Sequence, residues 1–159
     1  YQLHRPDPRV PLADSIGVLA ELKAEGKIRH IGISNAREDQ LREAERIAPI
    51  VSVQNRYNVN DRASEQMVDL CSQDGLAFLP WAPIQDTEQI IPVLAAAERH
   101  GVSERQIALA WLLARSPVIL PIPGSGSPEH VAENVAAVAV ELSNEEYNSI
   151  TDVVQPAQS

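Results

Sequence analysis

The sequence predicts an α/β fold built on a parallel sheet, and three features indicate it. Strand-like and helix-like segments alternate from one end of the 159-residue chain to the other. Short turns join these segments, so each helix can serve as a crossover between two parallel strands. The apolar run at 118–122 is continuous rather than alternating, as in strands covered on both faces. Local sequence leaves open whether the sheet is doubly wound or belongs to a (β/α)8 barrel.

The hydrophobic periodicity places about five strands and seven helices along the chain. We expect the strands over residues 1–4, 28–33, 50–53, 76–79 and 118–122. We expect helices over residues 14–25, 38–47, 61–74, 87–100 and 103–115, one capped by Ser127 with Pro128 at its first position, and a final one from Ser143 to about Val154. Ser103 with Gln106 and Ser143 with Glu146 have the spacing of capping boxes. No linker interrupts this pattern, so residues 1–159 are expected to form a single domain.

Composition and charge exclude several classes of function. The hydrophobic fraction of 44% is typical of a globular protein, and a net charge of −9 argues against a nucleic-acid partner. No apolar run approaches the roughly 20 residues that span a bilayer, so we expect no membrane partner. The single cysteine, Cys71, lies in an apolar stretch and is interpreted as packing. We expect no metal site and a reducing, cytoplasmic location.

Polar or ring-bearing residues stand where the expected strands end. These ends are His4, Ser34-Asn35, Gln54, Trp81 and the turn 123–126. Because ligands bind at the carboxyl ends of parallel strands, their coincidence predicts a ligand site. Each residue alone also has a structural interpretation, since such a histidine can cap a loop and Ser-Asn can form a turn. The glycine-rich turn, followed by a helix, can bind an anion such as phosphate or be an ordinary loop.

Five stretches, in this order, resemble the C-terminal half of an aldo-keto reductase, strands four to eight of the barrel. They read YQLHRPDP, GKIRHIGISNA, VQNRYN, LPWAPI and PIPGSGSPEHVAENV. The resemblance implies a partial (β/α)8 TIM barrel of about five parallel strands with flanking helices and a C-terminal helix. It implies an NAD(P)H-dependent enzyme that reduces aldehydes or ketones to alcohols by hydride transfer, with a small-molecule carbonyl compound as substrate.

The resemblance also assigns a role to each matching residue. His4 matches the catalytic histidine that donates a hydrogen bond to the substrate carbonyl. Ser34, Asn35 and Gln54 match the trio that holds the nicotinamide carboxamide, and Trp81 stands where an aromatic ring stacks on the nicotinamide. The adjoining backbone of Ala82, Pro83 and Ile84 matches the pyrophosphate loop. The adenosine end of the cofactor matches Pro123, Gly124, Ser125, Gly126, Ser127, His130, Glu133 and Asn134, the last two at the adenine amine.

Two departures from the family pattern concern the cofactor's 2′-phosphate. Gly124 stands where many members have a lysine, and His130 stands at a common arginine position. A neutral imidazole binds a phosphate less strongly than a guanidinium group, which can form two hydrogen bonds to it. NADPH is therefore the expected cofactor, with NADH possible.

A third departure concerns the proton donor. The family's catalytic tyrosine, lysine and aspartate belong to the first three strands, and none of Tyr1, Tyr57 and Tyr147 occupies the tyrosine position. A missing N-terminal half-barrel is therefore expected as a partner. The alternative is a truncated, catalytically inactive half-barrel that retains a partial nucleotide-binding or interaction surface. A doubly wound ligand-binding domain requires the strand-end matches to be coincidence.

Overall fold

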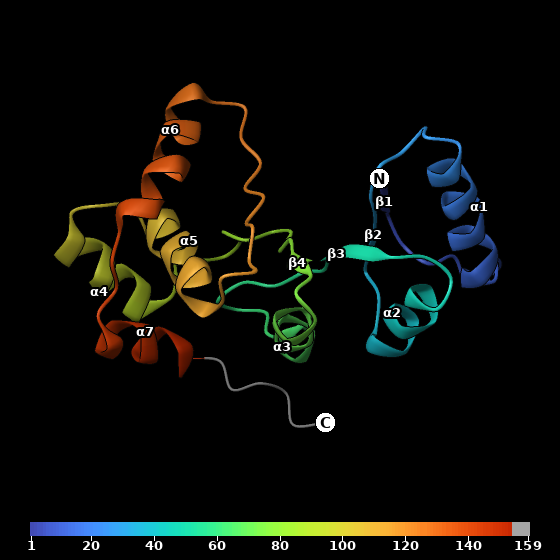
Figure 1. Ribbon diagram of the computed structural model, residues 1–159. Coiled ribbons are helices and arrows are strands. Elements are labelled where there is room, and N and C mark those ends of the chain that lie inside the picture. The colour runs from blue at the N-terminus through green and yellow to red at the C-terminus, as the bar shows by residue number, and fades with distance from the viewer. Residues whose placement is uncertain (154–159) are drawn as a thin grey trace.

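Four short parallel strands lie side by side in chain order in one sheet (Figure 1). The computed structural model describes residues 1–153, and within them the strands are β1 (Gln2–Leu3), β2 (Ile31–Ser34), β3 (Ile50–Gln54) and β4 (Ala77–Phe78). Every neighbouring pair is parallel. The predicted α/β architecture with a parallel sheet is therefore confirmed.

The segment 118–122 differs from the prediction, because it forms an isolated bridge rather than a fifth strand. Ile119 bridges Phe78, whose N–H donates to the Val118 carbonyl and whose carbonyl accepts from the Leu120 N–H, both at 2.8 Å. Leu120 is 55% exposed and Ile122 is 38% exposed. The expectation that this run is covered on both faces is therefore wrong. The segment meets β4 along one side, and no other strand of the described sheet adjoins it.

The strand register divides the sheet residues into two rows on opposite faces. One row consists of Leu3, Ile33, Val53 and Phe78, and it contributes to the hydrophobic core with the helices. The other row consists of Gln2, Gly32, Ser52 and Ala77, which are small or polar. In this second row, the Ser52 hydroxyl donates to Gln2 Oε1 at 3.1 Å.

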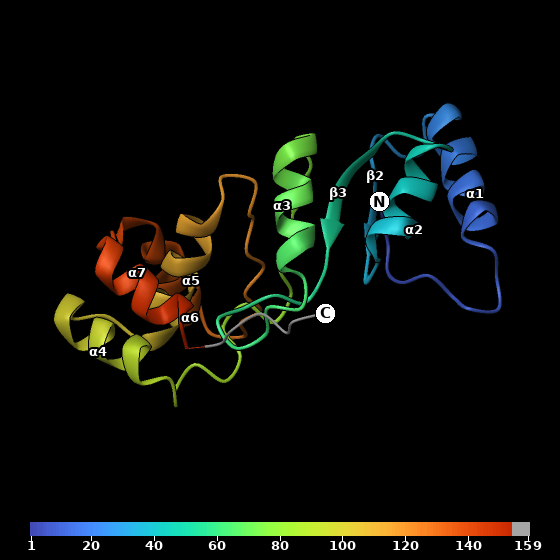
Figure 2. The ribbon, with the colours of Figure 1, turned by 90° about the horizontal axis from the view of Figure 1, so that it is seen from below.

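The helices gather in two groups on either side of the sheet's middle. They are α1 (Leu12–Ala24), α2 (Glu38–Glu45), α3 (Glu65–Asp74), α4 (Ile91–His100), α5 (Glu104–Arg115), α6 (Pro128–Ala136) and α7 (Asn144–Thr151), with a 3₁₀ helix η1 at Ala137–Ala139. Figures 1 and 2 place α1 and α2 beside β1 and β2, α4 to α7 at the other end, and α3 between them. The sheet is open, since four strands cannot close an eight-stranded barrel.

The helix ends show which local signals were reliable. Both expected capping boxes form, at Ser103 with Gln106 and at Ser143 with Glu146. The Ser127 hydroxyl caps α6 by accepting from the His130 N–H at 3.4 Å. Helices α3 and α4 begin later than predicted, and η1 was not predicted. The predicted end of the last helix near Val154 lies outside the described residues.

Two further sequence expectations concern Cys71 and the membrane. Cys71 is fully buried in the core, and burial raises the pKa of its thiol to about 12, so its interpretation as packing is confirmed. Over residues 1–153, none of the helices combines the length and apolar character that crossing a membrane requires.

Candidate active site

The carboxyl ends of β2 and β3 are tied together by hydrogen bonds. Ser34, the last residue of β2, is 1% exposed, and its hydroxyl donates to the Gln54 backbone carbonyl at 2.6 Å. The same carbonyl accepts from the Asn35 backbone N–H at 3.0 Å. These bonds bring together the three residues that the resemblance assigns to the nicotinamide carboxamide. The Gln54 side-chain amide makes no hydrogen bond to any residue in the range 1–153.

The Asn35 side chain joins the ends of three strands. Its Nδ2 donates to the His4 backbone carbonyl at 2.9 Å and to the Ser34 hydroxyl at 3.2 Å. Its Oδ1 accepts from the Trp81 indole Nε1 at 3.0 Å. Asn35 also has a φ of 54°, a left-handed conformation that asparagine tolerates better than most residues. The structure thus brings His4, Ser34, Asn35, Gln54 and Trp81 into one cluster at this edge of the sheet.

Arg56, which is not among the residues predicted from the sequence, lies beside the Trp81 ring. The Arg56 guanidinium carbon lies 5.6 Å from the ring centroid, within the range of a cation–π contact. The Trp81 backbone N–H donates to the Asn55 carbonyl at 3.1 Å, which fixes the chain around the ring. The available signal was the VQNRYN stretch, where Arg56 follows Gln54 by two positions.

The backbone after Trp81 forms the loop that the resemblance assigns to the cofactor's pyrophosphate. Ala82 has a φ of 53°, and its carbonyl accepts from Asn58 Nδ2 at 2.8 Å. Pro83 is buried, whereas Ile84 is partly buried against the core. Sequence reasoning did not identify Asn58, because its contact with Ala82 joins two loops that are distant in the chain.

His4 lies on the surface directly after β1. It is exposed, and it lines a hollow of about 670 Å³ formed by residues 1–5 and 7–9. Within residues 1–153 its ring nitrogens make no hydrogen bond, whereas its backbone carbonyl is held by Asn35. The imidazole is therefore not occupied by any described residue, while its backbone is tied to the strand-end cluster through Asn35.

The residues assigned to the adenosine end form a separate group. They lie in the turn before α6 and on α6 itself, and most of them are exposed. The Ser125 hydroxyl donates to the Ser127 carbonyl at 3.2 Å, and the Ser127 hydroxyl donates to Glu129. This bond from Ser127 lowers the pKa of the Glu129 carboxyl. Figures 1 and 2 both place α6 and β2 on opposite sides of α3. No hydrogen bond between described residues joins the two groups.

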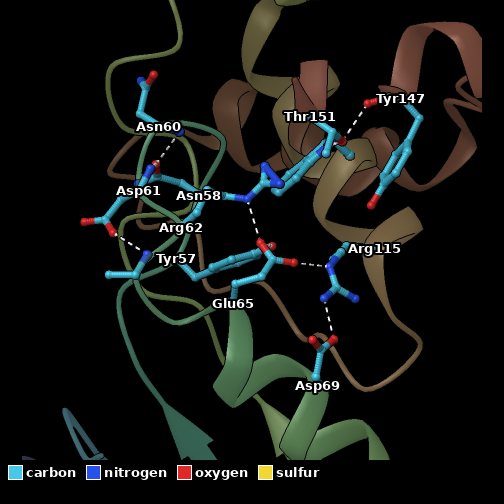
Figure 3. A network of polar contacts seen from close by, with 12 residues as sticks. Tyr57, Asn58, Asn60, Asp61, Arg62, Glu65, Asp69, Arg115, Tyr147 and Thr151 are labelled. Atoms are coloured by element: carbon cyan, nitrogen blue, oxygen red, sulfur yellow. Dashed lines mark hydrogen bonds and ion pairs between the residues drawn. The ribbon is translucent and has the colours of Figure 1, made fainter. Parts of the chain in front are cut away.

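A polar network joins the loop that follows β3 to α3 and α5 (Figure 3). Tyr57 is fully buried, and its hydroxyl donates to Glu65 at 2.8 Å. Arg62 Nε donates to the same carboxylate at 2.8 Å, and Arg115 Nε reaches the carboxylate's other oxygen at 2.6 Å. The Arg62 guanidinium carbon also lies 4.4 Å from the centroid of the Trp111 ring. This network was not predicted, because the chain brings its members together only after folding.

The network determines the protonation of its members. Burial raises the pKa of Tyr57, and its hydroxyl is occupied by a carboxylate. Burial alone would raise the pKa of Glu65, but hydrogen bonds from Arg62, Tyr57 and Arg115 hold it below its usual value. Tyr57 is therefore unsuited to donate a proton to a substrate, and Glu65 stays ionised.

Among residues 1–153, no group of three or more histidine, cysteine, aspartate or glutamate side chains is placed to hold a metal ion.

Comparison with known proteins places this geometry in context. The chain is 43% identical over 155 residues to an uncharacterized oxidoreductase of Schizosaccharomyces pombe, covering 96% of this chain and 51% of that protein. It is 42% identical over 141 residues to pyridoxine 4-dehydrogenase of Escherichia coli, covering 87% of this chain and 49% of that protein. The chain thus spans about half the length of these curated relatives.

Solved structures show the same relationship. A thermostable aldo-keto reductase, Tm1743, solved with the inhibitor epalrestat, matches with a TM-score of 0.89 and 33% identity, over 97% of this chain and 59% of that chain. An aldo/keto reductase from Klebsiella pneumoniae, solved with NADP and acetate, matches with a TM-score of 0.89 and 28% identity, over 100% and 59% of the two chains. The fold is therefore that of part of an aldo-keto reductase barrel.

The chain also matches the sequence model of a protein family. The model of the aldo/keto reductase family matches residues 1–88 and 85–155, nearly the whole sequence. The strand-end residues quoted from the sequence lie within these matches. The chain belongs to the aldo/keto reductase family.

Proposed function

We propose that this chain, as one domain, supplies the C-terminal part of an NADPH-dependent oxidoreductase that reduces aldehydes or ketones to alcohols. The observation that carries the proposal is the Asn35 side chain, which joins His4, Ser34 and Trp81 at one edge of the sheet. Membership of the family and the NADP bound in the Klebsiella pneumoniae protein support it. A cytoplasmic location stays a prediction.

The donor set of this cluster fits a nicotinamide carboxamide, which carries one acceptor oxygen and an NH2 donor. The Gln54 amide has both a donor and an acceptor, and neither is used by residues 1–153. The Ser34 hydroxyl donates its hydrogen to the Gln54 carbonyl and keeps a lone pair. Asn35 Oδ1 likewise keeps acceptor capacity beside its bond from Trp81. Gln54 is therefore the group that offers both complementary atoms, with Ser34 and Asn35 held in place beside it.

The adenosine end has space for a ligand. A Cβ added at Gly124 or Gly126 would meet no atom within 4 Å, so protein packing does not require these glycines. An extended dinucleotide suits two separate groups of binding residues that lie on opposite sides of α3 (Figure 1). The Ser125 and Ser127 hydroxyls already bind within the turn, and Ser127 also takes the His130 N–H at the start of α6. The donors that remain there are the backbone N–H groups of residues 124–126, which make no hydrogen bond to residues 1–153.

In the proposed reaction, the cofactor and the residues of this chain have different roles. A bound nicotinamide supplies the hydride. Trp81 offers a ring face, and Asn35 holds its indole edge. His4 is free to donate a hydrogen bond to the substrate carbonyl. Transfer to a carbonyl also needs a proton for the developing alkoxide, and Tyr57 does not provide it because its hydroxyl is bound to Glu65. We therefore propose that a missing N-terminal half-barrel supplies the family's tyrosine, lysine and aspartate.

The test measures binding and turnover separately. NADPH and NADH binding are titrated for the 159-residue chain and for a form extended by the N-terminal residues that the relatives carry. We expect binding and carbonyl reduction by the extended form, and about tenfold weaker NADPH binding for Gln54→Glu. Gln73→Glu, the same change at an exposed position of α3, should bind as the unchanged protein does. Equal binding by both variants would contradict the assignment of Gln54.

The alternative function is a catalytically inactive half-barrel that retains a partial nucleotide-binding or interaction surface. One observation favours it: the Tyr147 ring is stacked on Trp111 with a centroid distance of 6.1 Å, so neither it nor Tyr57 faces the strand-end cluster. Nucleotide binding without carbonyl reduction by the extended form would support this alternative. Carbonyl reduction by that form would exclude it.

A further inference from the structure

Two residues of the loop after β4 have left-handed backbone although neither is glycine. Ala82 has a φ of 53°, and Asp86 has a φ of 56°. An aspartate side chain can form local hydrogen bonds that favour this conformation, but the alanine methyl group cannot. The conformation of Ala82 must therefore be held by its surroundings.

The Asn58 side chain is the group that reaches Ala82. Asn58 is 1% exposed, and its Nδ2 donates to the Ala82 carbonyl at 2.8 Å. Its Oδ1 accepts from the backbone N–H groups of Asn60 at 2.9 Å and Asp61 at 2.8 Å. The amide therefore has one orientation, with its oxygen toward its own loop and its nitrogen toward Ala82.

The loop that carries Asn58 is itself anchored. Tyr57 precedes Asn58 and Arg62 follows it, and both donate to the Glu65 carboxylate (Figure 3). The Asn58 backbone N–H also donates to the Asp61 carbonyl at 3.0 Å, which closes the turn. A fixed loop thus presents a fixed donor to Ala82.

Ala82 is covalently joined to Trp81, whose indole Nε1 donates to Asn35 Oδ1 at 3.0 Å. We propose that Asn58 is a positioning residue: it holds Ala82 in the left-handed conformation and so keeps the Trp81 indole against Asn35. The effect on the indole follows from the contacts alone. The effect on cofactor binding rests on the proposed function.

Asn58→Asp tests the contact by replacing the amide nitrogen with an oxygen and altering no other heavy atom. The aspartate keeps an acceptor for the Asn60 and Asp61 N–H groups, but it places an oxygen instead of a donor opposite the Ala82 carbonyl. The protein is labelled with ¹⁵N-tryptophan, and its two indole signals are assigned with Trp111→Phe. We expect Asn58→Asp to shift the Trp81 signal and leave the Trp111 signal in place, and to weaken NADPH binding about tenfold.

Asn60→Asp is the matched control on the same loop. Asn60 Nδ2 donates to the Asp86 carbonyl, so the same chemical change removes the same kind of bond. That bond is exposed and four residues beyond Ala82. We expect both indole signals and the NADPH affinity to stay as in the unchanged protein.

Ala82→Gly provides a second, independent variant. Glycine adopts a positive φ without strain, so in the Ala82→Gly background Asn58→Asp should shift the Trp81 signal less than in the parent. The proposal is overturned if Asn58→Asp leaves the Trp81 signal in place or shifts both indole signals alike. If the unchanged protein binds no NADPH, the proposed function fails, whereas the indole shifts still decide the role of Asn58.

Discussion

The Trp81 indole Nε1 lies 3.0 Å from Asn35 Oδ1, although the two residues are 46 positions apart in the chain. Asn35 follows β2 and Trp81 follows β4, so this bond crosses the end of β3, where Gln54 lies. Asn35 reaches this position through a left-handed backbone and a second bond to the His4 carbonyl. One amide therefore links the residues expected to bind the nicotinamide to the residue expected to bind the substrate.

Trp81→Phe should show how much of the cofactor binding depends on the indole N–H of Trp81 and how much on its aromatic face. Trp81→Phe removes the donor to Asn35 but leaves an aromatic face, so we expect NADPH binding to weaken about tenfold. Trp111→Phe is the control, because the Trp111 indole donates to Thr151 rather than to the site. It should lower the free energy of unfolding and leave the NADPH affinity nearly unchanged. Titration of both variants with NADPH checks this prediction, and equal affinities would contradict it.

The Glu65 carboxylate should be essential for stability. Glu65→Gln leaves the buried Arg62 guanidinium, whose side chain is 4% exposed, without its counter-charge. We expect the free energy of unfolding to fall by about 2 kcal/mol, less than for a fully buried pair, because Glu65 is itself partly exposed. Asp69→Asn removes a carboxylate that is 53% exposed from the same network and should cost well under 1 kcal/mol. Urea denaturation of both variants measures the difference, and similar losses would refute the prediction.

The features that were predicted correctly from the sequence depend on residues that are close together in the chain. The alternation of strands and helices is written in local periodicity, and the capping boxes at Ser103 and Ser143 need only residues three positions apart. The residues at the strand ends were identified because all parallel strands end at one edge. The pairing of Glu65 with Arg115 joins positions 50 apart, and no local pattern indicates it.

The wrong predictions concern features that depend on contacts with other parts of the fold. The apolar run at 118–122 has strand propensity, but a strand also needs partners, and the described sheet offers only Phe78 beside it. Helix α3 was expected from residue 61 and begins at Glu65, because Asn58 accepts the N–H groups of Asn60 and Asp61 and holds a turn there. The left-handed backbone of Ala82 depends on the same side chain, and an alanine in the sequence gives no signal for it.

The capping box of α7 predicts a defined pH dependence. The Ser143 N–H, aided by Arg99 and His100, lowers the pKa of the Glu146 carboxyl to about 2. A carboxyl whose pKa is lower in the folded protein stabilises it fully above its ordinary pKa, and this contribution is lost as the pH falls through about 2. Glu146→Gln should therefore lower the free energy of unfolding by about 1 kcal/mol at neutral pH and have little effect near the acid limit.

Glu145→Gln is the control for this pH dependence. Glu145 is its exposed neighbour in the first turn of the same helix, and it makes no side-chain hydrogen bond to described residues. It should show a much smaller difference from the unchanged protein at every pH. Denaturation curves over a pH series give the comparison, and parallel curves for the two variants would rule the prediction out.

We expect that position 32 needs glycine because side chains on the adjacent strands leave no space for a Cβ, and not because its backbone conformation demands glycine. A Cβ at Gly32 would overlap Gln2 Oε1 and Ser52 Oγ, which pair with it in register and hydrogen-bond to each other. Gly32→Ala should therefore lower the free energy of unfolding by about 1 kcal/mol, the lower end for overpacking, because the flexible Gln2 side chain can move aside. Adding Gln2→Ala and Ser52→Ala removes both obstacles, so the triple variant should lose less stability than the sum of the separate changes.

Gly17→Ala is the control, because a Cβ there meets no atom within 4 Å. Within α1 it should stabilise the protein by about 0.5–1 kcal/mol. Urea denaturation decides the matter: additive losses in the triple variant would show that the backbone, and not Gln2 and Ser52, requires the glycine.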